Sequence, residues 1–113
     1  MDADIFFAAG DEAPVVTDTL AVGGLPIDLT GATVTFRYSK RDGTSALIVS
    51  ESATIVLPAT DGNVEWQPVA ALAPGDFLCE WRVVLASGDQ LTVPNDRHLL
   101  MRVKGPPPST PAP

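Results

Sequence analysis

Cysteine and histidine are nearly absent from this sequence, which contains one of each, Cys79 and His98. A single cysteine excludes an internal disulfide, and together the two residues cannot form the Cys/His cluster of a structural zinc site. We therefore expect no metal and no other cofactor.

Basic residues are also scarce, because 7 Lys and Arg stand against 14 Asp and Glu, for a net charge of −7. Such a surface repels phosphate backbones, so nucleic acid is excluded as a partner. Long apolar runs are missing as well: the N-terminal stretch MDADIFFAAGDEAP has no basic start and a short apolar run. This is far below a signal peptide or a membrane span of about 20 residues, which predicts no membrane partner and folding in a cytoplasm.

Helical periodicity is the third absence. No segment repeats apolar residues every 3.6 positions, although PVAALAPGD, residues 68–76, could form one short helical turn before Pro74. The 113 residues suit one domain, and 9 Gly and 11 Pro indicate a chain rich in turns. The sequence predicts an all-β fold.

Two segments show the alternation of half-buried strands. In ATVTFRYSK (32–40) and DFLCEWRVVLA (76–86), every second residue is apolar. The predicted inward set is Val34, Phe36, Tyr38, Phe77, Cys79, Trp81, Val83 and Leu85. Cys79 and both tryptophans, Trp66 and Trp81, are accordingly interpreted as core residues rather than a reactive thiol or a sugar platform.

Six further short segments are bounded by glycine, proline and Asx turn signals. They begin near residues 5, 15, 46, 63, 90 and 98. Seven to eight strands at this spacing predict an antiparallel β-sandwich or a small barrel.

The chain changes character after residue 104. The last nine residues, GPPPSTPAP, hold five prolines and no apolar anchor, which favours extended polyproline II. We predict a β-sandwich domain at 1–104 and a flexible tail at 105–113. The tail is either a solvated end or an arm that orders on a neighbouring subunit, which makes Pro106, Pro107, Pro108 and Pro111 candidate partner contacts.

The segment PNDRHL contains the one candidate for catalysis, the pair Asp96 and His98. Catalysis there would need a nucleophile and an orienting group, and Asn-Asp after proline is also ordinary turn chemistry. Since Leu99, Met101 and Val103 should face the core, His98 should face outward, and Arg97 and His98 become candidate partner contacts. We expect no enzymatic activity and no catalytic residue.

Acidic residues are spread over the first quarter of the chain without the spacing of a calcium loop, so we expect a solvated face. They are Asp2, Asp4, Asp11, Glu12, Asp18 and Asp28. The sequence also has no Gly-rich phosphate loop and no G-x-S-x-G motif.

Three stretches of the sequence resemble a known family. DIFFAAGDEAP, LPIDLTGATVTFRYSKRDGT and GDFLCEWRVVLASGDQLTVPND are similar to the small immunoglobulin-like domain at the N-terminus of phage baseplate upper proteins and to short phage tail proteins. The matching elements are Asp4 to Phe7, Asp28 to Ala32, Glu80 to Trp81, and Pro94 to Asp96, within about residues 4–103. Arg97 and His98 depart from the glycine and aromatic residue usual in that family, and we expect the proline tail rather than a receptor-binding domain after the module.

The resemblance implies an immunoglobulin-like sandwich that serves as a structural virion protein of a tailed phage. Its partners would be other phage proteins of the tail or baseplate, in a symmetric homo-oligomer located in the virion. A capsid decoration or neck protein is the alternative place in the particle. Two readings from other classes are a small enzyme using Asp96 and His98, and a carbohydrate-binding module.

Overall fold

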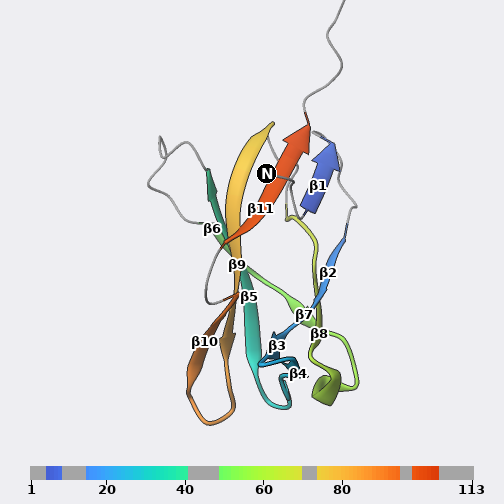
Figure 1. Ribbon diagram of the computed structural model, residues 1–113, viewed down its shortest axis with the longest axis vertical. Coiled ribbons are helices and arrows are strands. Elements are labelled where there is room, and N and C mark those ends of the chain that lie inside the picture. Colours follow the sequence, from blue (N-terminus) through green and yellow to red (C-terminus); the bar gives the residue numbers. More distant parts are fainter. Residues whose placement is uncertain (1–4, 9–14, 41–48, 70–73, 95–97, 105–113) are drawn as a thin grey trace, which may run out of the picture.

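The chain folds into strands that form two packed sheets and a small hairpin in a computed structural model (Figure 1). The structure describes residues 5–8, 15–40, 49–69, 74–94 and 98–104. Within them the fold is all-β and mostly antiparallel, and its one helical element is the 3-10 turn η1 (Ala59–Asp61), so the predicted class is confirmed. No described helix is long and apolar enough to cross a membrane.

Eleven strands are present in the described residues. They are β1 (Ile5–Ala8), β2 (Val16–Thr19), β3 (Ala21–Val22), β4 (Leu25–Pro26), β5 (Thr33–Lys40), β6 (Val49–Ser52), β7 (Thr54–Ile55), β8 (Asn63–Trp66), β9 (Gly75–Val84), β10 (Gln90–Val93) and β11 (Leu99–Lys104). Three of these have only two residues, and the predicted count of seven to eight is not confirmed.

The larger sheet has the order β1-β11-β9-β5-β6, and β10 also pairs with β9, beyond the end of β11. The smaller sheet has the order β2-β8-β7, and β3 and β4 form a separate hairpin. Every pairing is antiparallel except that of β1 with β11. Two segments that were each predicted as one strand contain two strands. Segment 15–22 contains β2 and β3, and segment 46–57 contains β6 and β7, because in each the chain passes from one sheet to another.

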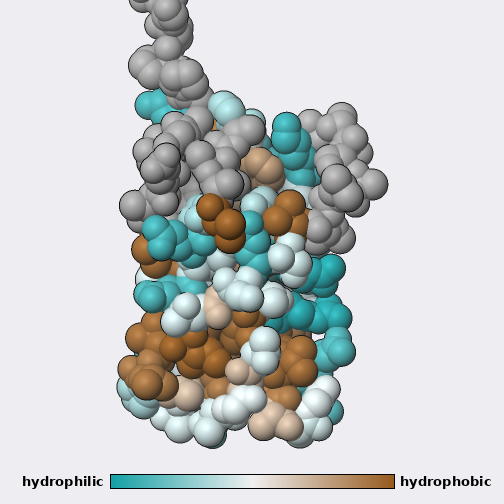
Figure 2. Space-filling model, turned by 180° about the vertical axis from the view of Figure 1, so that it is seen from behind, coloured by the Kyte–Doolittle hydropathy of each residue, from teal (hydrophilic) through white to brown (hydrophobic). Residues whose placement is uncertain are grey.

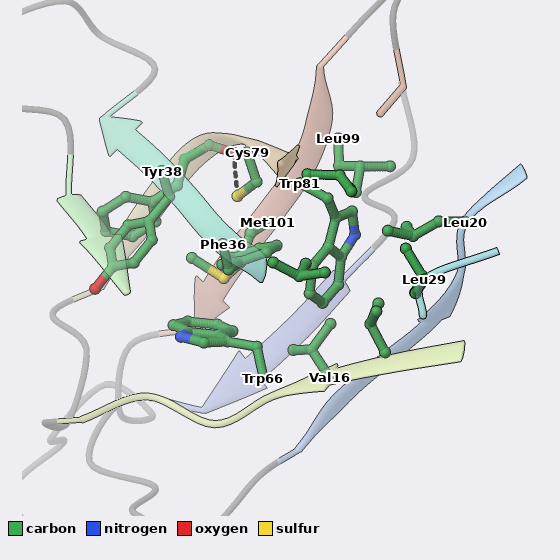
Figure 3. Close-up of a cluster of buried hydrophobic side chains, with 14 of the residues drawn as sticks. Val16, Leu20, Leu29, Phe36, Tyr38, Trp66, Cys79, Trp81, Leu99 and Met101 are labelled. Atoms are coloured by element: carbon green, nitrogen blue, oxygen red, sulfur yellow. Dashed lines mark hydrogen bonds between the residues drawn. The ribbon is translucent and has the colours of Figure 1, made fainter. Parts of the chain in front are cut away.

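The core lies between the sheets and is centred on aromatic rings (Figure 3). Phe36 of β5 stacks on Trp66 of β8, with ring centroids 4.2 Å apart, and meets Trp81 of β9 edge-on at 4.8 Å. Cys79 is fully buried beside them. The predicted inward set of β5 and β9 is therefore confirmed, with Leu85 partly buried against the cluster.

A partly buried carboxylate contact supports this cluster. The indole Nε1–H of Trp66 donates a hydrogen bond of 2.9 Å to Oε1 of Glu51, which comes from β6 of the other sheet. The polar edge of the ring is thus satisfied although the side chain is almost fully buried. The contact also links the two sheets at one side of the sandwich.

Gly62 joins η1 to β8 and has a positive φ of 72°. A Cβ atom there would lie 2.6 Å from the carbonyl oxygen of Leu20, closer than real Cβ contacts allow. The close approach exists because the backbone N–H of Leu20 donates to the Gly62 carbonyl at 2.8 Å. Glycine is therefore required at this position, where the chain enters the smaller sheet.

Candidate functional site

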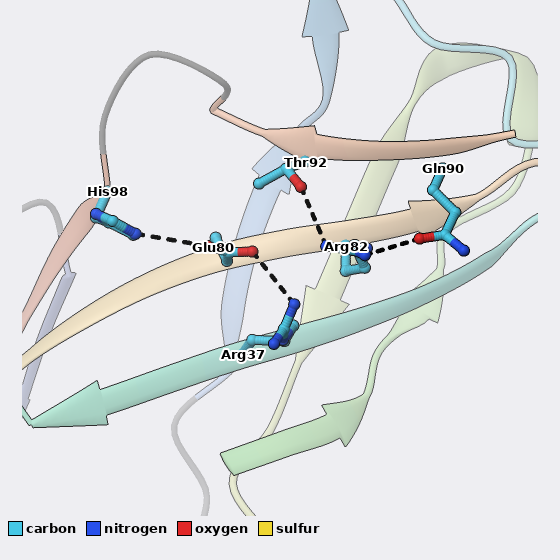
Figure 4. A network of polar contacts seen from close by, with 6 residues as sticks. All are labelled: Arg37, Glu80, Arg82, Gln90, Thr92 and His98. Carbon is cyan, nitrogen blue, oxygen red and sulfur yellow. Dashed lines mark hydrogen bonds and ion pairs between the residues drawn. The ribbon is translucent and has the colours of Figure 1, made fainter. Parts of the chain in front are cut away.

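Polar side chains form a row on the outer face of the larger sheet (Figure 4). Glu80 of β9 lies between Arg37 of β5 and His98, with Oε2 3.6 Å from Arg37 Nη1 and Oε1 3.5 Å from His98 Nε2. The His98 side chain is 56% exposed. It faces away from the core, where Leu99, Met101 and Val103 are buried, as the alternation predicts.

The same row continues along β9 to Arg82. Its Nη2 donates to Gln90 Oε1 at 2.7 Å, and its Nη1 lies 3.5 Å from Thr92 Oγ1, so the guanidinium crosses from β9 to β10. These contacts are between neighbouring strands of one sheet. They support the strand pairing and do not converge on a common point.

The described depression beside His98 is small. The depression lined by Arg37, Tyr38, Glu80 and His98 has a volume of about 60 Å³, against roughly 300–1,000 Å³ for ligand pockets. Asp96 lies outside the described residues, so the structure does not test the Asp96 and His98 pair. Arg97 and the tail prolines Pro106, Pro107, Pro108 and Pro111 also lie outside them, and their partner-binding roles stay predictions.

A larger cavity lies where β2, at the edge of the smaller sheet, approaches the end of β10 and the start of β11. Its volume is about 380 Å³, and we name it the seam cavity. It is lined by Val16–Thr19, Ile5, Ala21, Val93, Pro94 and Leu99. Within the described part of the chain, β2 pairs only with β8 and β10 only with β9, so each presents an open edge.

The hydrogen-bonding direction of β2 follows from its register. Val16 is opposite Trp66 and Asp18 is opposite Val64, and the bond from Leu20 N to Gly62 O continues the same ladder. Because alternate residues of an antiparallel strand bond to the same neighbour, Val16 and Asp18 direct their backbone groups toward β8. Thr17 consequently directs its backbone N–H and C=O toward the open edge.

Among the residues that the structure describes, Asp18 is the one acidic residue in the lining of the seam cavity. Its Oδ2 accepts a hydrogen bond of 3.0 Å from Trp81 Nε1, and its Oδ1 accepts one of 2.8 Å from the backbone N–H of Thr19. The side chain shares the inward side of β2 with Val16 and Leu20, both buried. The expectation of a solvated face is thus wrong for Asp18, and the alternation in VVTDTL was the signal for its inward direction.

A second exposed feature is apolar. Figure 2 shows hydrophobic side chains gathered at the lower end of the molecule, the end at which Figure 1 places β3, β4 and η1. Exposed apolar residues in these elements include Val22 and Leu25 of the hairpin and Leu57 before η1, with Leu57 81% exposed. We name these three residues the apolar end.

A metal centre does not fit the described side chains. They contain no group of three or more His, Cys, Asp or Glu residues able to hold an ion. The sulfur atoms of Cys79 and Met101 belong to fully buried side chains in the core. The acidic residue Glu80 has its Oε1 3.5 Å from His98 Nε2. Copper and zinc sites in proteins ordinarily need about three or four such ligands.

This fold has counterparts among solved structures. The structure is similar to that of CopC from Methylosinus trichosporium OB3b, with a TM-score of 0.54 and 15% identity, covering 92% of this chain and 86% of that one. It is also similar to PcoC, a copper resistance protein from Escherichia coli, with a TM-score of 0.50 and 17% identity, covering 90% and 91% of the two chains. At these identities the likeness concerns the fold. No family model and no curated protein matches the sequence.

These similarities correct the interpretation as a phage protein. The structural neighbours are CopC and a copper resistance protein, so the resemblance to phage baseplate upper proteins and short phage tail proteins was wrong. The same finding overturns the virion role in tail or baseplate, the capsid decoration or neck alternative, the phage partners in a symmetric oligomer, and the virion location. The motifs that carried the resemblance are short and local: Glu80 and Trp81 lie within β9, and Asp28 to Ala32 lead into β5. Unrelated sandwiches share such features for the same physical reasons.

Proposed function

We propose that this chain is a protein-binding module with an immunoglobulin-like sandwich topology, which holds an extended segment of another polypeptide at the seam cavity and catalyses no reaction. Strand addition to an open sheet edge is a recurring mode of peptide recognition, in which backbone hydrogen bonds supply affinity and side-chain pockets supply specificity. The seam cavity offers both elements within one site.

The observation that carries the proposal is the outward backbone of Thr17 beside a 380 Å³ cavity. Open edges are ordinarily blocked, because unpaired N–H and C=O groups recruit other strands. Here the Asp18 side chain accepts a hydrogen bond from the backbone N–H of Thr19, but not from that of Thr17. The Asp18 side chain therefore blocks one position of the β2 edge and leaves the position of Thr17 open.

The absence of turnover is supported by the arrangement of the polar row. Glu80 pairs with both His98 and Arg37 beside a depression of about 60 Å³, and the row serves strand pairing. A general base needs a substrate proton within hydrogen-bond reach and a place for the substrate, and this depression supplies no such place.

Peptide selection tests the proposal directly. A display library of random peptides is selected on the folded protein, and the enriched peptides are measured on Thr17→Pro and Thr17→Ala. The proline removes the outward N–H without touching the ladder to β8, so affinity should fall about tenfold or more, whereas the alanine variant keeps the N–H and should bind like the parent.

Circular dichroism and thermal melting check that both variants fold. Peptides that bind Thr17→Pro as tightly as the parent would contradict the proposal. So would peptides whose binding is abolished by Leu25→Ser at the apolar end and unaffected at Thr17.

Copper binding is a second candidate function, favoured by the fold shared with PcoC, a copper resistance protein. The described donors do not assemble a site, so His98 is the residue on which to test it. We expect no stoichiometric uptake when Cu²⁺ is titrated into the protein and followed by electron paramagnetic resonance. One equivalent bound by the parent and lost in His98→Ala would favour copper binding instead.

A further inference from the structure

We propose that the segment bound at the seam cavity carries a lysine or arginine side chain that pairs with Asp18, flanked by apolar residues two positions away on each side. This inference rests on the proposed function and names the chemistry of its partner. Its basis is the position of one carboxylate on the inward side of an edge strand.

Asp18 has capacity for a further donor. An ionised carboxylate offers about four lone-pair sites, and Asp18 uses one on each oxygen, for Trp81 and for Thr19. These two bonds fix the side chain in one orientation at the cavity wall. A cationic group entering the cavity would meet a carboxylate that is already ordered, so little further side-chain entropy is lost on pairing.

The geometry of strand pairing gives the spacing of the partner residues. Residues directly opposite each other on paired strands project from the same face, with Cβ atoms about 4.5–5.5 Å apart. A guest residue opposite Asp18 therefore points toward the seam cavity, as do the guest residues two positions before and after it. Those two would lie near the apolar lining supplied by Val16, Val93 and Leu99.

Charge repulsion disfavours a second copy of this chain as the occupant of the β2 edge. Two β2 edges in register would bring two Asp18 carboxylates together, and each chain carries a net charge of −7. Like charges facing each other across strands are destabilising, and an inward-pointing charge on an edge strand is a known device against self-pairing. The same carboxylate attracts a basic strand, so the occupant is a different polypeptide with a cation at this position.

The test compares two selections from the same random peptide library, one on the parent protein and one on Asp18→Asn. Sequences enriched on the parent should share a lysine or arginine with apolar residues at the second position on either side. Selection on Asp18→Asn should lose that basic preference. Asp61→Asn, an exposed acid of η1 that changes the net charge equally, is the matched control and should keep it.

Affinities then separate the contact from general effects. For the best peptide we expect the Kd to rise about tenfold on Asp18→Asn, and about tenfold when its basic residue is replaced by norleucine on the parent. Both changes together should cost little more than either alone, because they remove the same contact. The norleucine arm needs no change in the protein, so it decides the matter even if Asp18→Asn folds poorly.

The outcomes distinguish the two proposals. Peptides that need the Thr17 N–H but show no basic preference, or that tolerate norleucine, would overturn the role of Asp18 and leave strand binding intact. Peptides indifferent to Thr17→Pro would overturn strand binding itself, and with it this inference.

Discussion

The two faces of the paired strands β5 and β9 use the same backbone for opposite purposes. Inward, Phe36 and Trp81 are fully buried, with ring centroids 4.8 Å apart. Outward, Arg37 and Glu80 meet at 3.6 Å with both side chains partly exposed. Residues that point inward and residues that point outward alternate along the paired strands β5 and β9.

The difference teaches where the stability of the sandwich resides. Burial of large apolar side chains removes them from water and contributes roughly 1.5–3 kcal/mol each. An exposed ion pair exchanges protein contacts for water contacts and is worth about 0–1 kcal/mol. We therefore expect substitutions on the inner face to decide folding, and substitutions on the outer face to leave it nearly unchanged.

The largest effect is expected from Phe36→Ala. The ring contacts both tryptophans, so its removal leaves a cavity and should lower the free energy of unfolding by about 3–5 kcal/mol. Urea unfolding followed by tryptophan fluorescence measures it. Thr35→Ala, the neighbour on the outer face of the same strand, should change it by no more than about 0.5 kcal/mol. Equal losses at the two positions would contradict the contrast between the faces.

A smaller loss is expected from Glu51→Ala. This change removes the carboxylate that accepts from the Trp66 indole N–H at a partly buried site, which should cost about 1–3 kcal/mol. The near-ultraviolet circular dichroism of Trp66 should change as well. Ser52→Ala, one residue along on the exposed side, is the control. An unchanged free energy of unfolding in Glu51→Ala would show that the bond contributes nothing net.

The burial of Tyr38 on the inner face makes the stability of the protein depend on pH. Burial, with Glu51 nearby as the next cause, raises the pKa of Tyr38 to about 12, from 10.0 in the absence of the fold. Because the folded state holds the neutral phenol, this contribution to stability is complete below pH 10, declines as the pH rises, and is lost above about 12.

The measurement is direct because the chain has one tyrosine. Phenolate absorbance should titrate near pH 12 in the folded protein and near 10 in urea, and Tyr38→Phe should abolish both steps. A folded-state midpoint near 10 would contradict the buried environment of this ring.

The smallest effect is expected from Glu80→Gln. Removing the charge between Arg37 and His98 should change the free energy of unfolding by less than about 0.5 kcal/mol, and the change should shrink in high salt. Thermal melts at low and high ionic strength test this. A loss above 1 kcal/mol that persists in high salt would mean that the polar row supports the fold as strongly as the core does.

The strands with clear alternation were predictable from the sequence, and the sites were not. β5 alternates apolar and polar residues, and every second residue of β9 from Phe77 to Val83 is apolar, so their inward faces followed from period two. Asp18 follows the same rule within VVTDTL, yet the seam cavity needs β10, β11 and β2 brought together from distant parts of the chain. The protein family was predicted wrongly, because short motifs report local backbone geometry rather than ancestry.

By itself, the sequence determined the all-β class and the direction of each side chain on the well-patterned strands, since these depend on local alternation and on turn residues. It also determined that Cys79 and both tryptophans lie in the core. Only the tertiary structure decided which strand edges stay open, that Thr17 directs its backbone outward, and that Asp18 lies beside Trp81. Those facts depend on sheet order and register, which arise from contacts between residues far apart in the chain.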